Sequence, residues 1–380
     1  MITTPLTLEL VRGAARLEPT PRGQRPDRLP AGVARQTGDG QLAAMAGQPA
    51  GVRLALTTTT TVIELVSHPT HVTFRGVDRP RGAIDLVVDG ELVASDPLTA
   101  GTSVVTDLAT GEVTTTEGPD HLTRLEDLPP GEKRLELWLP HNEGLELLEL
   151  RSDAPVSPAP SAPRRWMHHG SSISQGSNAT SPARTWPSLV ARGAGAELVN
   201  LGMGGAAMVD PLMARVIRDA PADVINLAFG INFVNADAMR RRAFVPAVHG
   251  FLDTIRDGHP TVPLLLATPL YCAIHEDTPG PLSIDPEALA EGRLRYAATG
   301  DPEDVPAGRL TLRVVREALA AVVEEREDPH LHLVDGLSLY GEADTAEHPL
   351  EDGLHPDTAT HALIAERVLA QVTGSGGPFS

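Results

Sequence analysis

Four short stretches of this sequence carry the residue types that acyl transfer requires. They are Gly-Ser-Ser-Ile-Ser-Gln-Gly at 170–176, Asn-Leu-Gly-Met-Gly-Gly at 200–205, Gly-Ile-Asn at 230–232 and Asp-Gly-Leu-His at 352–355. Acyl transfer needs a hydroxyl nucleophile, a base that takes its proton, and hydrogen-bond donors for the negative oxygen of the tetrahedral intermediate. Each stretch alone is a weak signal, but together they offer all three components.

In order and content, these four stretches resemble the Ser, Gly, Asn and His blocks of the SGNH or GDSL hydrolases. The resemblance covers residues from about 165 to 373. The Gly-Ser-Ser-Ile form of the first block, preceded by a β-rich region, is similar to a two-domain subgroup of that family. The resemblance therefore implies a catalytic domain with an N-terminal β-sandwich ahead of it.

The resemblance also implies a role for five residues. Aligned on the family's Gly-Asp-Ser-Leu, the nucleophile falls on Ser172, whose backbone N–H would also face the oxyanion. The second glycine of the Asn-x-Gly-x-x-Gly block, Gly205, would donate its N–H, and Asn232 would donate through its side-chain amide. His355 would act as the base, and Asp352 would hold its imidazole tautomer.

Some positions leave alternatives open. Ser171 stands where the family usually has Asp, which makes it a rival nucleophile. Glu351 is an alternative carboxylate for the base. The segment 202–207 also resembles the Gly-x-Gly-x-x-Ala fingerprint of dinucleotide binding, although Pro211 follows too soon for a helix that opens at the glycines.

The resemblance implies chemistry through an acyl intermediate on Ser172. The expected reaction moves an acyl group from a thioester, such as acyl-CoA as cosubstrate, to a hydroxyl of a small molecule such as a polyketide. Met203, Phe229 and Phe233 flank the expected site and are candidates to line a pocket for an aromatic acyl group. Hydrolysis of a carboxylic ester by the same residues is one alternative, and a non-catalytic carbohydrate-binding protein is another. No metal or redox cofactor is required.

The C-terminal region must position these residues, and its pattern is α/β. Strand candidates lie at 165–169, 197–201, 224–229, 263–268 and 331–334, and helix candidates at 186–192, 208–219, 240–257, 310–326 and 358–372. Strands that alternate with helices predict a parallel sheet covered on both faces. Together with the resemblance, this pattern predicts a three-layer αβα, flavodoxin-like domain. The first three blocks begin where strand candidates end, and such sheets bind ligands at the carboxyl ends of their strands.

The first part of the chain has a different texture. Short β-branched and alternating segments, such as 52–66 and 135–139, are separated by turn signals, with no convincing helix. This pattern favours an all-β sandwich of the jelly-roll kind. The proline-rich segment 154–163 is expected to be a linker. The predicted organisation is a sandwich domain at 1–153, the linker, and a catalytic domain at 164–380.

Composition restricts the partners. The formal net charge of −19 argues against nucleic acid and anionic membranes, because both require a basic surface. Cys272 is the only cysteine, so no disulfide can form within the chain. The first residues lack the basic and apolar regions of a signal peptide. We therefore expect a cytoplasmic protein that acts on small molecules.

Overall fold

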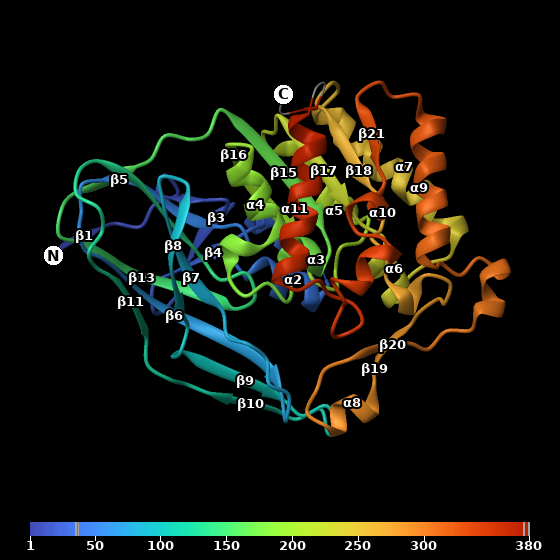
Figure 1. Cartoon of the computed structure of the whole chain (residues 1–380), viewed down its shortest axis with the longest axis horizontal. Coiled ribbons are helices and arrows are strands. Elements are labelled where there is room, and N and C mark those ends of the chain that lie inside the picture. The colour runs from blue at the N-terminus through green and yellow to red at the C-terminus, as the bar shows by residue number, and fades with distance from the viewer. Residues whose placement is uncertain (35, 37, 375–376, 379–380) are drawn as a thin grey trace.

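The computed structural model describes residues 1–34, 36, 38–374 and 377–378. An all-β part formed by the N-terminal residues lies beside an α/β part formed by the C-terminal residues (Figure 1). The predicted fold class is confirmed: a parallel-sheet αβα domain preceded by a β-sandwich. No helix among the described residues is long and apolar enough to cross a membrane.

The sandwich consists of two mainly antiparallel sheets. One has the order β10-β9-β6-β13-β4-β3, with β1 on β13 and β11 on β6, and the other has the order β14-β5-β12-β7-β8, with β2 on β5. The strands are β1 (Ile2–Thr4), β2 (Val11–Arg12), β3 (Arg16–Pro19), β4 (Gln24–Asp27), β5 (Arg53–Thr58), β6 (Ile63–Phe74), β7 (Ala83–Val88), β8 (Glu91–Pro97), β9 (Thr102–Thr106), β10 (Val113–Thr116), β11 (His121–Leu125), β12 (Lys133–Trp138), β13 (Gly144–Ser152) and β14 (Val156–Pro158). Alternating side chains of the two sheets, including Leu54, Leu65 and Leu137, bury a common core between them.

The α/β part is built on one five-stranded sheet. Its strands are β16 (Ala196–Gly202), β15 (Arg164–Gly170), β17 (Val224–Ala228), β18 (Leu264–Ala267) and β21 (Leu331–Val334), in that spatial order and all parallel. In chain order this is 2-1-3-4-5, the flavodoxin-like arrangement. Because the sheet is covered on both faces, its central strands include continuous apolar runs such as Leu-Leu-Leu-Ala in β18.

Helices cover both faces of this sheet (Figure 1). α4 (Trp186–Gly193) and α11 (Thr358–Thr373) pack against each other, as do α5 (Pro211–Asp219) and α7 (Arg241–Gly258), and α9 (Leu312–Arg326) packs against α7. Shorter helices are α3 (Ser172–Gln175), α6 (Ile231–Asn235) and α10 (Gly336–Leu339), and the 3₁₀ turns are η1 (Pro182–Arg184) and η4 (Glu342–Ala346). α5 begins at Pro211 rather than at 208, because proline is favoured in the first helical turn.

The expectation of no helix before residue 153 was wrong. The chain forms α1 (Ala31–Ala34) and α2 (Gly40–Ala46), and Asp39 caps α2 by accepting from the N–H of Gln41. Leu42 and Ala46 of α2 pack into the core of the α/β part rather than into the sandwich core. A seven-residue helix with only two buried positions gives too weak a periodic signal for sequence analysis.

Contacts between the two parts are extensive. Arg53 of β5 forms a buried ion pair with Glu197 of β16, and its guanidinium lies 4.8 Å from the ring centroid of Trp138. Trp138 also shares an apolar cluster with Trp166 and Trp186. Within the expected linker, Val156–Pro158 is β14 and pairs with β5, so the sandwich holds this segment. The expected domain boundary itself stays a prediction.

A segment without a predicted structure separates β18 from α9. It contains η2 (Ala273–His275), β19 (Leu282–Ile284), α8 (Pro286–Ala290), β20 (Tyr296–Ala298) and η3 (Pro302–Ala307), and β19 and β20 form a separate two-stranded sheet. In Figure 1 this segment extends away from the α/β part toward the tip of β9 and β10. It therefore forms one wall of a space whose other wall is the sandwich.

Candidate active site

Three of the four sequence blocks meet at one edge of the parallel sheet. Gly170, the last residue of β15, lies in register with Gly202 of β16 on one side and Ala228 of β17 on the other. The loops that leave these strands therefore start side by side at the carboxyl edge. The fourth block, 352–355, lies in the loop before α11 and reaches the same edge.

The turn from β15 into α3 presents Ser172 to the cleft. Gly170 is required there by close packing, since a Cβ at this position would lie 2.1 Å from Oγ of Ser174. Ser171 caps α3 by accepting from the N–H of Ile173 at 3.3 Å. Ser172, the first helical residue, is left with a hydroxyl that lines the cleft.

A chain of hydrogen bonds joins Ser172, His355 and Asp352. Oγ of Ser172 lies 2.9 Å from Nε2 of His355, and Nδ1 of His355 lies 2.7 Å from Oδ2 of Asp352. This arrangement places a base next to a hydroxyl and a carboxylate behind the base. Of the two candidate nucleophiles it is therefore Ser172, and not Ser171, that contacts the imidazole. His355 is paired with Asp352 rather than with Glu351.

The surroundings of Asp352 keep it charged. Burial raises the pKa of this carboxyl, but hydrogen bonds from the His355 ring and backbone and from the Leu354 N–H outweigh burial and lower the pKa below its ordinary value. The distances of the two backbone bonds are 2.9 Å from Leu354 and 2.7 Å from His355. Asn178 donates a further hydrogen bond at 3.0 Å, a contact that the sequence gave no reason to expect. Asp352 is therefore a carboxylate at neutral pH.

The candidate oxyanion donors lie beside Ser172. Oδ1 of Asn232 accepts from the N–H of Ala207 at 3.0 Å, while its Nδ2 is buried and finds no acceptor among the described residues. A buried donor without an acceptor is rare, because leaving it unpaired costs free energy. Gly205 has φ +71° in the turn that also borders the cleft. An anionic oxygen bound there would supply the acceptor that Asn232 lacks.

We expect Asn232→Ala to lower the turnover number about 10²- to 10³-fold, the usual cost of one lost oxyanion donor. The Michaelis constant should change little, because the bond strengthens as the charge develops in the transition state. Steady-state kinetics with an activated aryl ester would measure both constants. A turnover number within threefold of the unaltered protein would remove Asn232 from the oxyanion site.

The glycine turn of the second block is held by residues of the N-terminal part. Gln175 accepts from the N–H of Gly204 at 2.8 Å and donates to Gln48, and Gln41 donates to the carbonyl of Gly204 at 2.9 Å.

Arg28, which is fully buried, donates to the carbonyls of Asn200 and Gly202 and also to that of Met45. Burial lowers the Arg28 pKa to about 9. The predicted nucleotide-binding alternative for 202–207 is wrong, because protein groups occupy this backbone and no helix begins there.

We expect Arg28→Met to lower the free energy of unfolding by about 3 kcal/mol. Methionine fills a similar volume but removes the guanidinium donor from the buried carbonyls of Asn200 and Gly202, at about 1–3 kcal/mol each, partly offset by removal of a buried charge. Urea unfolding followed by circular dichroism would measure the change. An unaltered unfolding midpoint would show that these carbonyls do not depend on Arg28.

The prediction for the acyl-pocket residues needs correction. Met203 and Phe233 are fully buried in the core of the α/β part, where Phe233 packs edge-on against Phe244. Both follow strand ends, but neither is among the residues that line the cleft around Ser172. Phe229 is also buried, and it lines a separate apolar cavity.

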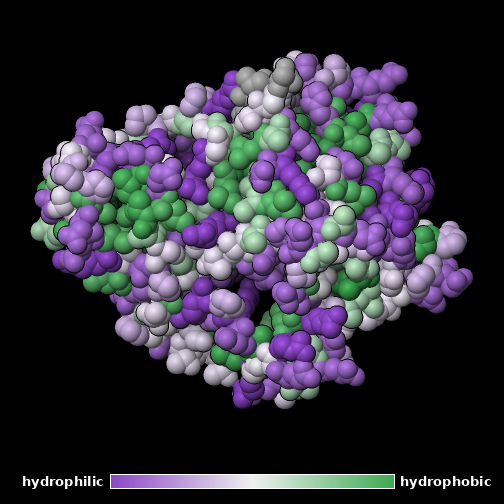
Figure 2. All heavy atoms as spheres, in the orientation of Figure 1, coloured by the Kyte–Doolittle hydropathy of each residue, from purple (hydrophilic) through white to green (hydrophobic). Residues whose placement is uncertain are grey.

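The cleft around Ser172 is bounded by three parts of the chain. It has a volume of about 1340 Å³, and its walls come from the sandwich, from α2 and from the segment between β18 and α9. Figure 2 shows the surface hollowed between the sandwich and that segment. Tyr296 of β20 stands edge-on to the His355 ring with centroids 5.8 Å apart, and its N–H donates to the carbonyl of Asp352.

Three buried histidines near the site make folding sensitive to acid. Burial lowers the pKa to about 3 for His141 and His168 and to about 4 for His361. In the unfolded chain they would titrate near the ordinary value of 6.5. The unfolded state therefore binds more protons, and the free energy of unfolding falls as the pH drops from about 6.5 toward about 4.

We expect His168→Phe to make this acid dependence shallower by about one proton, or about 1.4 kcal/mol per pH unit. Phenylalanine preserves the aromatic contact with Trp186, whose ring centroid lies 4.6 Å from that of His168. Urea unfolding at several pH values between 7 and 4.5 would give the slopes for both proteins. Parallel curves would mean that His168 is not the group that resists protonation.

Comparison with known proteins places this geometry in a family. The model of the GDSL-like lipase/acylhydrolase family matches residues 169–363, which include all four blocks. No curated protein matches the sequence at a level that would indicate a relative.

Solved structures resemble both parts of the chain together. The salicylyl-acyltransferase SsfX3 from a tetracycline biosynthetic pathway is 26% identical, with a TM-score of 0.76 over 94% of this chain and 92% of that one. A GDSL-like lipase from Bacteroides ovatus is 18% identical, with a TM-score of 0.67 over 94% and 93%. A family two carbohydrate esterase from Clostridium thermocellum, in complex with cellohexaose, is 15% identical, with a TM-score of 0.54 over 85% and 92%. The last two likenesses show the fold alone. The family match and the shared two-part fold confirm the resemblance seen in the sequence, and the chain belongs to the GDSL-like lipase/acylhydrolase family.

Proposed function

We propose that the protein is an acyltransferase that works through an acyl intermediate on Ser172. Oγ of Ser172 attacks the carbonyl carbon of a thioester such as acyl-CoA, and its proton passes to Nε2 of His355. The carbon–sulfur bond then breaks, and His355 returns the proton to the departing sulfur. A hydroxyl of a small-molecule acceptor next loses its proton to His355 and attacks the acyl group, which restores Ser172 and releases an ester.

The observation that carries this proposal is the hydrogen-bond chain from Ser172 through His355 to Asp352. It supplies the nucleophile and the base within contact distance, and the unpaired Nδ2 of Asn232 supplies a donor for the oxyanion. All residues of the mechanism come from this chain. The reaction needs no metal or redox cofactor.

The size of the cleft favours transfer over hydrolysis. Typical small-molecule sites have volumes of about 300–1000 Å³. The cleft of about 1340 Å³ has room for an acyl donor and an acceptor at the same time. The similarity to an acyltransferase over nearly the whole chain points in the same direction.

Ester hydrolysis is the second candidate, because the same cleft is wide enough to admit water. Every catalytic residue would be shared between the two reactions, and exclusion of water at the acyl-enzyme stage would decide between them. A single experiment therefore has to follow the lifetime of the acyl-enzyme.

Intact-mass spectrometry provides that experiment. The protein would be incubated with acyl-CoA thioesters and activated aryl esters, with and without hydroxyl acceptors. A transferase is expected to give an adduct on Ser172 that persists in water and disappears when an acceptor is added. An adduct that disappears in water alone would indicate an esterase. The absence of both adduct and turnover with every donor would contradict the proposed chemistry.

A further inference from the structure

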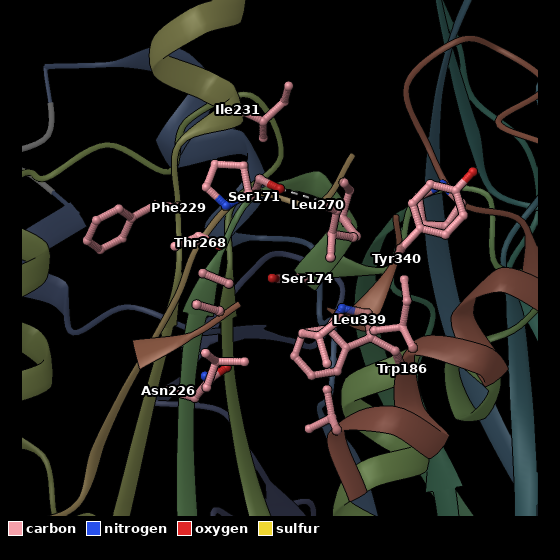
Figure 3. Close-up of a pocket in the computed structure, with 18 of the residues that line it drawn as sticks. Ser171, Ser174, Trp186, Asn226, Phe229, Ile231, Thr268, Leu270, Leu339 and Tyr340 are labelled. Atoms are coloured by element: carbon pink, nitrogen blue, oxygen red, sulfur yellow. Dashed lines mark hydrogen bonds between the residues drawn. The ribbon is translucent and has the colours of Figure 1, made fainter. Parts of the chain in front are cut away.

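A second cavity, partly open to the surface, lies behind the nucleophile, between the parallel sheet and α11 (Figure 3). Its walls are almost entirely apolar and include Trp186, Leu270 and Leu339. Ser171 and Ile231 lie at one end of the space shown in Figure 3, and Asn226 and Trp186 lie at the other. Protein interiors are close-packed and contain few voids larger than a water molecule. A cavity of this kind next to a reactive serine therefore calls for an occupant.

Leu354 connects this cavity to the cleft, because its side chain lines both. The residue is 4% exposed, and Asp352 accepts a hydrogen bond from its backbone N–H. The backbone is therefore held in place, and a passage between the two spaces at this point would depend on the rotamer of Leu354. At the same end, Ser171 lines the cavity while its neighbour Ser172 lines the cleft.

The shape of the cavity suits a thin chain. Ile364, Val368 and Val372 of α11 line it, and residues at this spacing span about 12 Å of helix. The volume is nevertheless only about 70 Å³. An engineered protein cavity that takes up benzene measures about 150 Å³. A cavity with less than half that volume is too small for an aromatic ring, and it has room for only about three carbons at the end of an alkyl chain.

Three polar side chains of the cavity wall are already hydrogen-bonded within the protein. Thr268 accepts from the N–H of Gly336 at 2.8 Å, and Tyr340 donates to the carbonyl of His348 at 2.6 Å. Asn226 donates to the carbonyl of Leu265 at 3.4 Å. Since these groups already have partners in the protein, they do not require polar atoms from a ligand.

We propose that this cavity binds the terminal carbons of a short, unbranched acyl group, of about four to six carbons in all, while that group is bound to Ser172. The inference rests on the proposed acyl-Ser172 chemistry and adds the class of acyl group to it. Leu354 opens the passage, and the chain enters the cavity along the sheet. Acetyl groups are too short to use it, and aromatic acyl groups are excluded from it by size.

Kinetics with p-nitrophenyl esters test the proposal through the burst of p-nitrophenolate, which reports acylation alone. From acetyl through butanoyl to hexanoyl, the acylation rate constant divided by the binding constant should rise about three- to fourfold per methylene. Ala267→Leu should fill the cavity from β18, reduce the hexanoyl value at least tenfold and leave the acetyl value within twofold. The acetyl ester thereby shows that the variant is folded. Equal effects on both esters, or a salicylyl ester that reacts best and is unaffected by Ala267→Leu, would overturn the proposal.

A covalent probe separates this inference from the proposed function. A p-nitrophenyl pentylphosphonate, the counterpart of a hexanoyl ester, would form a bond between phosphorus and Oγ of Ser172, with loss of p-nitrophenolate and transfer of the serine proton to His355. A crystal structure of the adduct with the end of the pentyl chain in the cavity would support the proposal. An adduct with its chain in the open cleft would overturn the proposal but leave the acyl-Ser172 chemistry intact. Absence of reaction at Ser172 would overturn the proposed function itself.

Discussion

Replacement of Ser172 by alanine is expected to reduce the turnover number about 10⁶-fold, the scale measured for removal of a nucleophile from a serine–histidine site. The hydroxyl is hydrogen-bonded to Nε2 of His355, and among the residues that the structure describes no other hydroxyl contacts this nitrogen. Covalent labelling by an activated ester should disappear completely. Intact-mass spectrometry would measure labelling, and steady-state kinetics would measure the residual rate.

Ser171→Ala is the matched control for this prediction. The two serines are adjacent, but Ser171 uses its oxygen to cap α3 and faces the second cavity. Loss of the cap should cost about 1 kcal/mol of stability, and labelling should proceed as before. If Ser171→Ala abolished labelling while Ser172→Ala preserved it, the nucleophile would have to be reassigned.

The sequence was sufficient to predict how the reactive residues converge. Parallel strands end at a common edge of the sheet, so the blocks that follow β15, β16 and β17 had to meet there. The structure shows this directly, because Gly170 lies in register with Gly202 and Ala228. Strand existence was predictable because buried parallel strands are continuous apolar runs. The two-part fold was predictable because the sequence pattern changes near residue 154 from short β-type segments to alternating strands and helices.

The residues that hold the site in place could not be predicted in the same way. Arg28 contacts the carbonyl of Gly202, which is 174 positions away along the chain. The sequence around a single arginine does not indicate which distant carbonyl it will bind. Met203 and Phe233 were misplaced because position next to a motif does not reveal on which side of a loop a side chain lies. The segment from 269 to 311 lacks a sustained period, so its role as a cleft wall emerged only from the folded chain.

Asp352→Asn should reduce the turnover number about 10⁴-fold while the fold is retained. Four donors converge on the Asp352 carboxylate: the His355 ring, the N–H groups of Leu354 and His355, and the amide of Asn178. An asparagine would bring an NH₂ group of its own into this set of donors. To relieve the conflict, His355 must present an acceptor at Nδ1, which puts the proton on Nε2 and prevents it from accepting the proton of Ser172.

The same argument defines the controls. Glu351→Gln removes the neighbouring carboxylate, which is exposed and is not the one that the structure pairs with His355, and should leave the rate within threefold. The acylation burst of each variant with p-nitrophenyl acetate would give the comparison directly. A rate for Asp352→Asn within tenfold of the unaltered protein would mean that Ser172 and His355 function as a pair without the carboxylate. Asp352 would then serve mainly to hold the 352–355 loop in place. An asparagine oxygen could still accept the two hydrogen bonds from the backbone N–H groups of this loop.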